Sequence, residues 1–268
     1  MKACLKYILI IFTALAMRVS YAQKLPNKQE ASVWVPTNVK IDGKASEWND
    51  KFQAHNDATN LFYTIANSDD FIYLIVHTKD PLVIETITSF GFIFDLQAVE
   101  KNSNKDNQVK IKFPLDDVKR LGLFLNKPGT TPDTSADALR SVMTGNNNIL
   151  QQRHKAIIVN GIEGLDTLSI YNDTGVKAVE AFDIKRNYTL EIAIPIKCLK
   201  FLKSSDSKLS YHLLINGFAG SKINARPLIT PPNLTPEEAQ AVAEMEIRIN
   251  GKYARTDFWG EYTLARKP

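Results

Sequence analysis

Residues 61–77 read LFYTIANSDDFIYLIVH, and this stretch decides the fold. Two apolar runs, Leu61–Ala66 and Phe71–His77, are rich in the β-branched and aromatic residues that strands favour. The residues between them, Asn67–Asp70, are all polar and of the types that favour turns. Two such runs around a short polar segment are typical of a β-hairpin, so the stretch predicts a pair of antiparallel strands.

Short runs of the same kind continue on both sides of this hairpin. In Val109–Phe113, apolar residues and lysines alternate strictly, which predicts a strand with one buried and one solvated face. Many short strands with frequent turns favour an antiparallel β-sandwich or barrel over a parallel sheet. We therefore expect an all-β fold, a jelly-roll-like antiparallel β-sandwich, in one domain. The further predicted strands are Val33–Val35, Val39–Ile41, Phe90–Leu96, Ala156–Val159, Thr167–Tyr171, Val176–Phe182, Tyr188–Ile194, Leu209–Phe218, Glu246–Ile249 and Phe258–Leu264.

Helical signals are few. Thr235-Pro236-Glu237-Glu238 forms a capping box with proline at the first helical position, and Ala-rich sequence follows to about Met245. A second short helix is expected around Ser135–Met143, with Asp133 or Thr134 as its N-cap. The expected sandwich therefore carries one or two short helices.

The composition is that of a globular protein. Its 268 residues are 44% hydrophobic and 23% charged, which excludes a disordered chain, a coiled coil and a collagen-like chain. The chain has 33 Lys and Arg residues against 29 Asp and Glu residues, and a net charge of +4 over this length does not favour a nucleic-acid partner. Two cysteines exclude a disulfide scaffold and a four-thiolate metal site.

Residues 1–22 have the parts of a secretory signal peptide. Lys2 and Lys6 precede the apolar run Ile8–Met17, and Ser20-Tyr21-Ala22 supplies small residues before a cleavage site. The apolar run is shorter than the ~20 residues that span a bilayer, and an uncleaved N-terminal anchor helix is the alternative. We expect cleavage after Ala22, a periplasmic or secreted protein, and no transmembrane segment once the signal is removed.

The mature chain would be nearly neutral. Residues 1–22 contain three of the 33 basic residues and no acidic residue, so 30 basic and 29 acidic residues remain. Cys4 leaves with the signal, and Cys198, in an apolar setting, is expected to be a buried, unreactive thiol. A neutral glycan or a protein surface is therefore a better expected partner than a polyanion.

Several stretches of the chain together resemble one known family. Residues 41–48, IDGKASEW, resemble the I-D-G-x-x-x-E-W opening of domains similar to family-nine carbohydrate-binding modules. Residues 60–80 resemble the paired strands that follow in that family, and Asp257–Leu264 is similar to its last strand. Residues 91–95 with 111–114 resemble a strand pair of exported relatives of the Bacteroides type, and Tyr188–Pro195 resembles an E-x-x-I-P strand.

The resemblance covers about residues 39–265, nearly the whole mature chain. It implies a β-sandwich that binds sugars in some members and holds structural calcium in some. We accordingly divide the chain into a signal peptide at 1–22, an N-terminal leader with the first strand at 23–38, and the module-like sandwich at 39–268.

The opening motif also has a physical interpretation. Asp42 and Gly43 suit a tight turn in which the aspartate accepts backbone N–H groups and the glycine adopts a positive φ. Glu47 and Trp48 follow, and the indole of Trp48 could cover one end of the core. We expect these four residues to be structural rather than ligand-binding.

A sugar site needs a flat aromatic face for the C–H surface of a pyranose and planar polar side chains for its hydroxyl groups. Modules of the kind that the resemblance implies often clamp a sugar between two indoles. Trp34 and Trp259 are the candidate carbohydrate-binding residues, with core packing as the favoured alternative for Trp259. Asn224 and Arg226 could line a binding rim or lie in a solvated loop.

The sequence carries no recognisable metal or catalytic motif. The four histidines lack zinc spacing, and no cofactor is expected. Asp69, Asp70 and Asp80 could place oxygen ligands for calcium at strand ends, although a solvated turn is the favoured explanation. A Gly-x-Ser-x-Gly elbow, a phosphate loop and a dinucleotide fingerprint are all missing, so we expect no enzyme activity.

These observations lead to one main hypothesis and two rivals. The main hypothesis is an exported, non-catalytic β-sandwich that binds a glycan. The first rival is a periplasmic structural or protein-interaction module, whose partner would be an envelope protein. The second is a hydrolase of envelope polymers, which would need two carboxylates across a cleft at ~5–10 Å.

Overall fold

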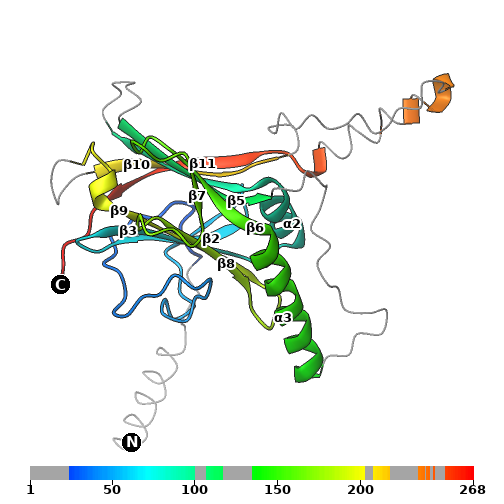
Figure 1. Cartoon of the computed structure of the whole chain (residues 1–268), viewed down its shortest axis with the longest axis horizontal. Helices are drawn as coiled ribbons and strands as arrows, with labels where there is room; N and C mark the ends of the chain where they lie inside the picture. Colours follow the sequence, from blue (N-terminus) through cyan, green and yellow to red (C-terminus); the bar gives the residue numbers. More distant parts are fainter. Residues whose placement is uncertain are drawn as a thin grey trace, which may run out of the picture.

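The computed structural model describes residues 24–99, 107–116, 135–202, 208–217, 235–238, 240–241, 244 and 251–268. In this part of the chain, two antiparallel sheets of five and six strands pack face to face (Figure 1). The architecture confirms the predicted antiparallel β-sandwich. The signal peptide predicted at residues 1–22 lies outside the described residues and stays a prediction.

The five-stranded sheet is built around the predicted hairpin. β2 (Leu61–Asn67) and β3 (Phe71–Thr78) pair in antiparallel register, with Ile65 opposite Leu74. β9 (Tyr188–Pro195) adds to β3, from a distant part of the sequence. β1 (Ala54–Asn56) and β8 (Lys177–Phe182) complete the order β1-β2-β3-β9-β8.

The six-stranded sheet has the order β11-β10-β4-β5-β6-β7. All neighbouring strands in it are antiparallel. Its strands are β4 (Phe92–Ala98), β5 (Gln108–Asp116), β6 (His154–Asn160), β7 (Thr167–Ser169), β10 (Lys208–Ile215) and β11 (Thr256–Thr263).

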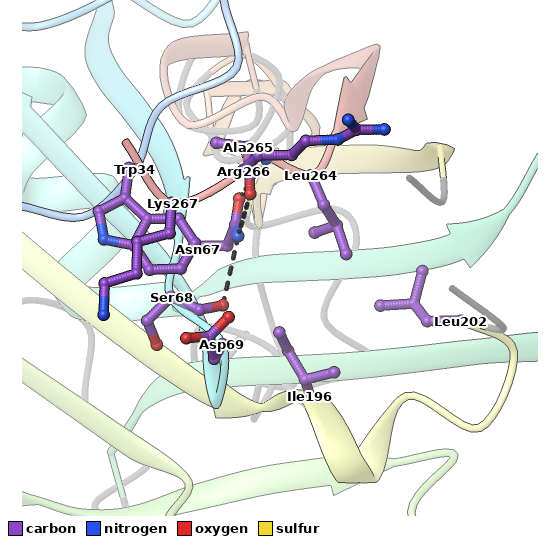
Figure 2. Close-up of a pocket in the computed structure, with 10 residues that line it drawn as sticks. All are labelled: Trp34, Asn67, Ser68, Asp69, Ile196, Leu202, Leu264, Ala265, Arg266 and Lys267. Atoms are coloured by element: carbon purple, nitrogen blue, oxygen red, sulfur yellow. Dashed lines mark hydrogen bonds between the residues drawn. The ribbon is translucent and has the colours of Figure 1, made fainter. Parts of the chain in front are cut away.

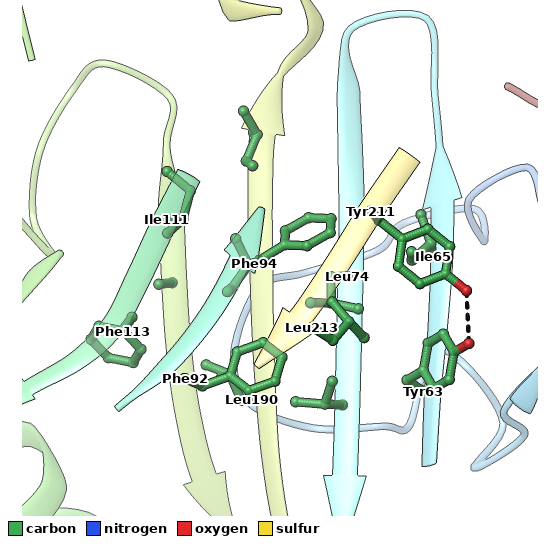
Figure 3. Close-up of a cluster of buried hydrophobic side chains, with 14 of the residues drawn as sticks. Tyr63, Ile65, Leu74, Phe92, Phe94, Ile111, Phe113, Leu190, Tyr211 and Leu213 are labelled. Carbon is green, nitrogen blue, oxygen red and sulfur yellow. Dashed lines mark hydrogen bonds between the residues drawn. The ribbon is translucent and has the colours of Figure 1, made fainter. Parts of the chain in front are cut away.

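The core lies between the facing surfaces of the two sheets (Figure 3). Phe92 and Phe94 of β4 point into it opposite Leu74 of β3, and all three are almost completely buried. The hydroxyl groups of Tyr63 and Tyr211 meet at 2.8 Å and join the two sheets by a buried hydrogen bond. Gly260 makes room for this contact, because a Cβ there would lie 2.2 Å from the Tyr211 ring.

A second layer covers the outer face of the five-stranded sheet. Residues 39–52 cross this face, and Trp48 packs there with Ala45, Ala66 and Ile75. Strand β9 is therefore buried on both faces, although its outer face carries the polar residues Thr189 and Glu191. Trp48 covers the outside of a sheet rather than one end of the main core.

The Glu191 carboxylate holds this layer in place. Its Oε2 accepts the backbone N–H groups of Asp42 and Gly43, each at 2.9 Å, and its Oε1 accepts the indole N–H of Trp48 at 3.0 Å. Gly43 has φ 77° and fits against β8, where a Cβ would lie 2.8 Å from the backbone of Ala181. Any other residue there would be strained and would clash.

The helices differ from the expectation in number and length. Helix α2 (Pro81–Phe90) was not predicted, although Asp80 caps it by accepting the N–H of Leu82 at 2.8 Å and Pro81 occupies its first turn. Helix α3 (Ala136–Arg153) runs ten residues beyond the predicted end, and its N-cap is Ser135 instead of Asp133 or Thr134. A short 3₁₀ helix, η2, spans Ile196–Cys198.

Three other local predictions have clear outcomes. The predicted capping box forms, since the Glu238 carboxylate accepts the N–H of Thr235 and the Thr235 hydroxyl accepts the N–H of Glu238. Val33–Val35 makes only an isolated bridge between Trp34 and Asn67, and Val39–Ile41 is not a strand. The strand predicted at Glu246–Ile249 lies outside the described residues.

Glu191 provides a test of the second layer. Burial raises the pKa of its carboxyl from 4.5 to about 7, against the opposing effect of the hydrogen bonds from Trp48, Gly43 and Asp42. A carboxyl with a higher pKa in the folded state contributes most to stability below pH 4.5, and this contribution declines as the pH rises to about 7. Glu191→Gln should destabilise the fold by about 1–3 kcal/mol, because its amide cannot accept from all three donors.

The difference in the free energy of unfolding between wild type and Glu191→Gln should therefore narrow between pH 5 and pH 8. Urea unfolding at several pH values measures this difference, with Glu47→Gln as a control for losing a carboxylate from the segment that packs over Glu191. A difference that widens with pH would contradict the prediction.

Candidate functional site

The outer face of the six-stranded sheet carries a line of polar and aromatic side chains. On β11, Phe258, Gly260 and Tyr262 are buried, so the alternating residue Trp259 points away from the core. Strand register places Trp259 opposite His212 of β10, His212 opposite Asp95 of β4, and Asp95 opposite Lys110 of β5. We call Trp259, His212, Asp95 and Lys110 the outer-face row.

Trp259 offers a flat aromatic surface. Its indole stacks on the His212 imidazole with ring centroids 4.1 Å apart and an angle of 6° between the planes. His212 is 7% exposed, and its Nε2 lies 2.6 Å from a carboxylate oxygen of Asp257. Trp259 itself is 42% exposed, so the expectation that it packs in the core was wrong. Asp257 thus holds the imidazole, and the imidazole stacks on the indole, part of which stays open to solvent.

Asp95 fixes the polar part of the row. This side chain is only 2% exposed, and its Oδ2 accepts from the amides of Gln108 at 2.6 Å and Gln97 at 3.3 Å. The ammonium of Lys110 lies 3.3 Å from the same oxygen. The Oδ1 atom has no hydrogen-bond partner within the described part of the chain. Burying a carboxylate costs free energy. The buried carboxylate of Asp95 orients the side chains of Gln108, Gln97 and Lys110.

The second candidate indole, Trp34, lines a pocket of about 480 Å³ (Figure 2). Ser68 and Asp69, from the β2–β3 turn, form one side of the pocket, and residues 264–267 form another. Figure 2 shows Ile196, Leu202 and Leu264 on the side away from Trp34. The pocket therefore combines one aromatic surface, an apolar wall and a few polar groups, as small-molecule sites commonly do.

Asn67 shapes this pocket by joining distant parts of the chain. Its Oδ1 accepts the N–H of Ala265 at 2.7 Å and the hydroxyl of Tyr262 at 2.8 Å, and its Nδ2 donates to the carbonyl of Ala265 at 3.0 Å. Its backbone pairs with Val33 and Val35 on either side of Trp34. We call these contacts the Asn67 pin.

The structure does not bring the two candidate indoles together. Trp259 lies on the outside of the six-stranded sheet and does not line the Trp34 pocket. The two-indole clamp that the resemblance implies is therefore not formed by Trp34 and Trp259. Asn224 and Arg226 lie outside the described residues and stay predictions.

The four motif residues lie on the opposite side of the sandwich, over the five-stranded sheet. The Asp42 carboxylate accepts the N–H of Lys44 at 3.1 Å, within the turn that Gly43 makes. Glu47 is half-buried and accepts the hydroxyl of Ser46 at 2.8 Å. Trp48 is 6% exposed, so its indole offers no surface to a ligand.

Sequence reasoning missed His212, Asp95, Gln97 and Gln108. Each alternates with buried apolar residues on its strand, so its outward direction could have been read from the sequence. Their neighbourhood could not, because it depends on the pairing of β10 with β4 across more than one hundred residues.

The described residues show no metal site and no membrane helix. They contain no group of three or more His, Cys, Asp or Glu side chains that could hold a metal ion. Of the acids considered for calcium, Asp80 caps α2 and accepts from Asn60 at 2.9 Å. Among the helices of this part of the chain, none is both long and apolar enough to span a bilayer.

No family model matches this chain, and no curated protein matches its sequence. Among solved structures, the chain is similar to a carbohydrate binding module family 9 (CBM9) from Caldicellulosiruptor kristjanssonii in complex with glucose. The two are 8% identical, the match covers 90% of this chain and 97% of that chain, and the TM-score is 0.41. A similarity at this level does not assign the chain to a family, and the kinship to Bacteroides-type proteins stays a prediction.

The Asn67 pin gives a testable prediction for the pocket. Asn67→Ala should lower the free energy of unfolding by about 2–4 kcal/mol, since buried donors and acceptors lose their partners. It should also speed hydrogen exchange in residues 262–267. Thr263→Ala, at an exposed position of β11, is the matched control. Unchanged exchange in the C-terminal segment would contradict the role given to the pin.

Proposed function

We propose that this protein is an exported, non-catalytic β-sandwich that binds carbohydrate, with the outer-face row as its main binding surface. One observation carries the proposal: the Trp259 indole is stacked on His212 and 42% exposed, on the same face of the sheet as two glutamine amides held by Asp95. An exposed aromatic plane and fixed planar amides are the groups that bind the C–H face and the hydroxyl groups of a sugar.

The chemistry of the row favours binding over hydrolysis. Cleavage of a glycosidic bond needs two carboxyl groups that both reach the substrate. Asp95 is 2% exposed, and Asp257 is engaged by His212. The two exposed acids of this face, Asp257 and Glu261, lie four residues apart on β11, roughly 13 Å along the strand. This separation exceeds the ~5–10 Å between the two carboxyl groups of a glycosidase, which supports a binding role.

The Trp34 pocket is a second place where a sugar could bind. Its indole and the polar groups of Ser68 and Asp69 have suitable chemistry, and its volume is within the usual range for small ligands. We rank it below the outer-face row because the side-chain amide of Asn67, the planar polar group of the pocket, already bonds Tyr262 and Ala265.

The rival role as a protein-interaction module has less support in the described residues. A docking surface for a protein usually shows a contiguous apolar patch. The large exposed hydrophobic side chains of this part of the chain, Leu82, Val99, Tyr171 and Trp259, come from four separate segments of the sequence. An envelope protein therefore remains the alternative partner.

Replacement of Trp259 tests the proposed function. Glycan-array screening followed by calorimetry should detect binding by wild type, and Trp259→Ala should weaken it at least about tenfold, or about 1.4 kcal/mol. Tyr171→Ala is the matched control, because Tyr171 is an aromatic residue that is 76% exposed near the far edge of the same sheet. An absence of binding by wild type to every glycan tested would remove the carbohydrate proposal.

Export is tested by the N-terminus of the mature protein. The full chain, expressed in a Gram-negative bacterium, should appear in the periplasm or medium with Gln23 as its first residue, because small residues precede the cut. Ala22→Arg should block cleavage and lengthen the product by 22 residues in mass spectrometry. An intact N-terminus in wild type would contradict the prediction.

A further inference from the structure

The outer-face row is longer than a single sugar ring. It crosses four neighbouring strands, from Trp259 on β11 to Lys110 on β5. Neighbouring strands lie about 4.8 Å apart, so the row extends roughly 14 Å across the sheet. A monosaccharide stacked on Trp259 would reach the residues of β10 but would leave β4 and β5 without a partner.

A second line of polar side chains runs beside the row. Register places Ser210 of β10 opposite Gln97 of β4, and Gln97 opposite Gln108 of β5. Each glutamine is half-exposed and uses its Nε2 to donate to Asp95. Because the amide nitrogen faces the buried carboxylate, each carbonyl Oε1 is directed away from it and is available to accept a hydroxyl group. The hydroxyl of Ser210 adds a third small polar group.

Charges on this face balance. Three acidic residues, Asp95, Asp257 and Glu261, and three lysines, Lys110, Lys112 and Lys208, belong to the outward positions of these strands. Asp95 pairs with Lys110, and Glu261 pairs with Lys208. A surface whose charges are matched in this way gives little attraction to an anionic or cationic polymer.

From these observations, and resting on the proposed function, we infer that the outer-face row binds a short uncharged oligosaccharide of about three rings across the strands. One ring stacks on Trp259, and the following rings place their hydroxyl groups on Ser210, Gln97 and Gln108. Asp95 acts as a positioning residue, because it is too buried to touch a ligand and acts through the two amides it holds.

A ladder of ligand lengths tests the inference with the intact mature protein. Calorimetry would use glucose, xylose and the cello-, xylo- and malto-oligosaccharides of two to four rings. In at least one series, affinity should rise at least tenfold between one and three rings and change less than threefold from three to four. Oligogalacturonides of matching length, which carry negative charge, should bind more weakly than the neutral series.

Variants along the row locate the rings. Gln108→Ala should weaken the trisaccharide roughly threefold to tenfold, as expected for one lost hydrogen bond, and leave the monosaccharide unchanged. Asp95→Asn should weaken trisaccharide binding by a similar factor and also leave monosaccharide binding unchanged. A variant that stays folded and is only less stable would show no such selective loss of affinity. Gln151→Ala, at an exposed position of α3, is the matched control, and circular dichroism confirms folding of each variant.

The outcomes separate the inference from the proposed function. A flat ladder with binding still lost in Trp259→Ala would overturn the oligosaccharide inference and leave the sugar-binding function. Loss of binding in Trp34→Ala but not in Trp259→Ala would move the site to the pocket and overturn the inference. If oligogalacturonides bound more tightly than the neutral series, the inference that the ligand is uncharged would be overturned. If no sugar bound, both proposals would be overturned.

Discussion

The buried carboxylate of Glu191 is the contact on which the arrangement of the layers depends. It lies on β9 within the five-stranded sheet and accepts three N–H groups from residues 42–48. A carboxyl group so deeply placed is tolerated only when its oxygens are satisfied, so segment 39–52 must fold over this face. One face of β9 then belongs to the main core and the other to the second layer. On the outer side of the six-stranded sheet, no described segment covers Trp259 in this way. The outer-face row lies on that side.

Much of the fold could be predicted because the alternation of apolar and polar residues within short segments indicates its strands. Residues 61–77 form the hairpin as expected, and the strict alternation of Val109–Phe113 does lie in a strand. Helix α2 was missed because Val83, Ile84 and Ile87 also suit a strand, and only Asp80 and Pro81 mark a helix start. The second layer could not be predicted, because the partners of Glu191 lie about 150 residues away in sequence and depend on tertiary packing.

The candidate site, like the fold, could be predicted only in part from the sequence. Trp259 and Trp34 could be selected by residue type alone, since few side chains offer a flat aromatic surface. Their surroundings follow from strand order: β11 reaches β4 only through β10, and this register gives Trp259 its neighbours His212 and Asp95. The periodicity of the sequence indicates on which face of the sheet a residue lies. Its neighbours on the adjacent strands can be identified only when the strand order and register are known.

The Asn67 pin has a consequence for the order in which the protein can fold. It joins Val33, near the start of the described chain, to Tyr262 and Ala265, near its end. Contacts this distant in sequence form slowly, and these cannot form until the last strand has been synthesised. The contacts between these two ends of the sandwich are therefore absent until β11 has been synthesised. A polypeptide that closes late suits passage through a narrow translocation pore, which the proposed export requires.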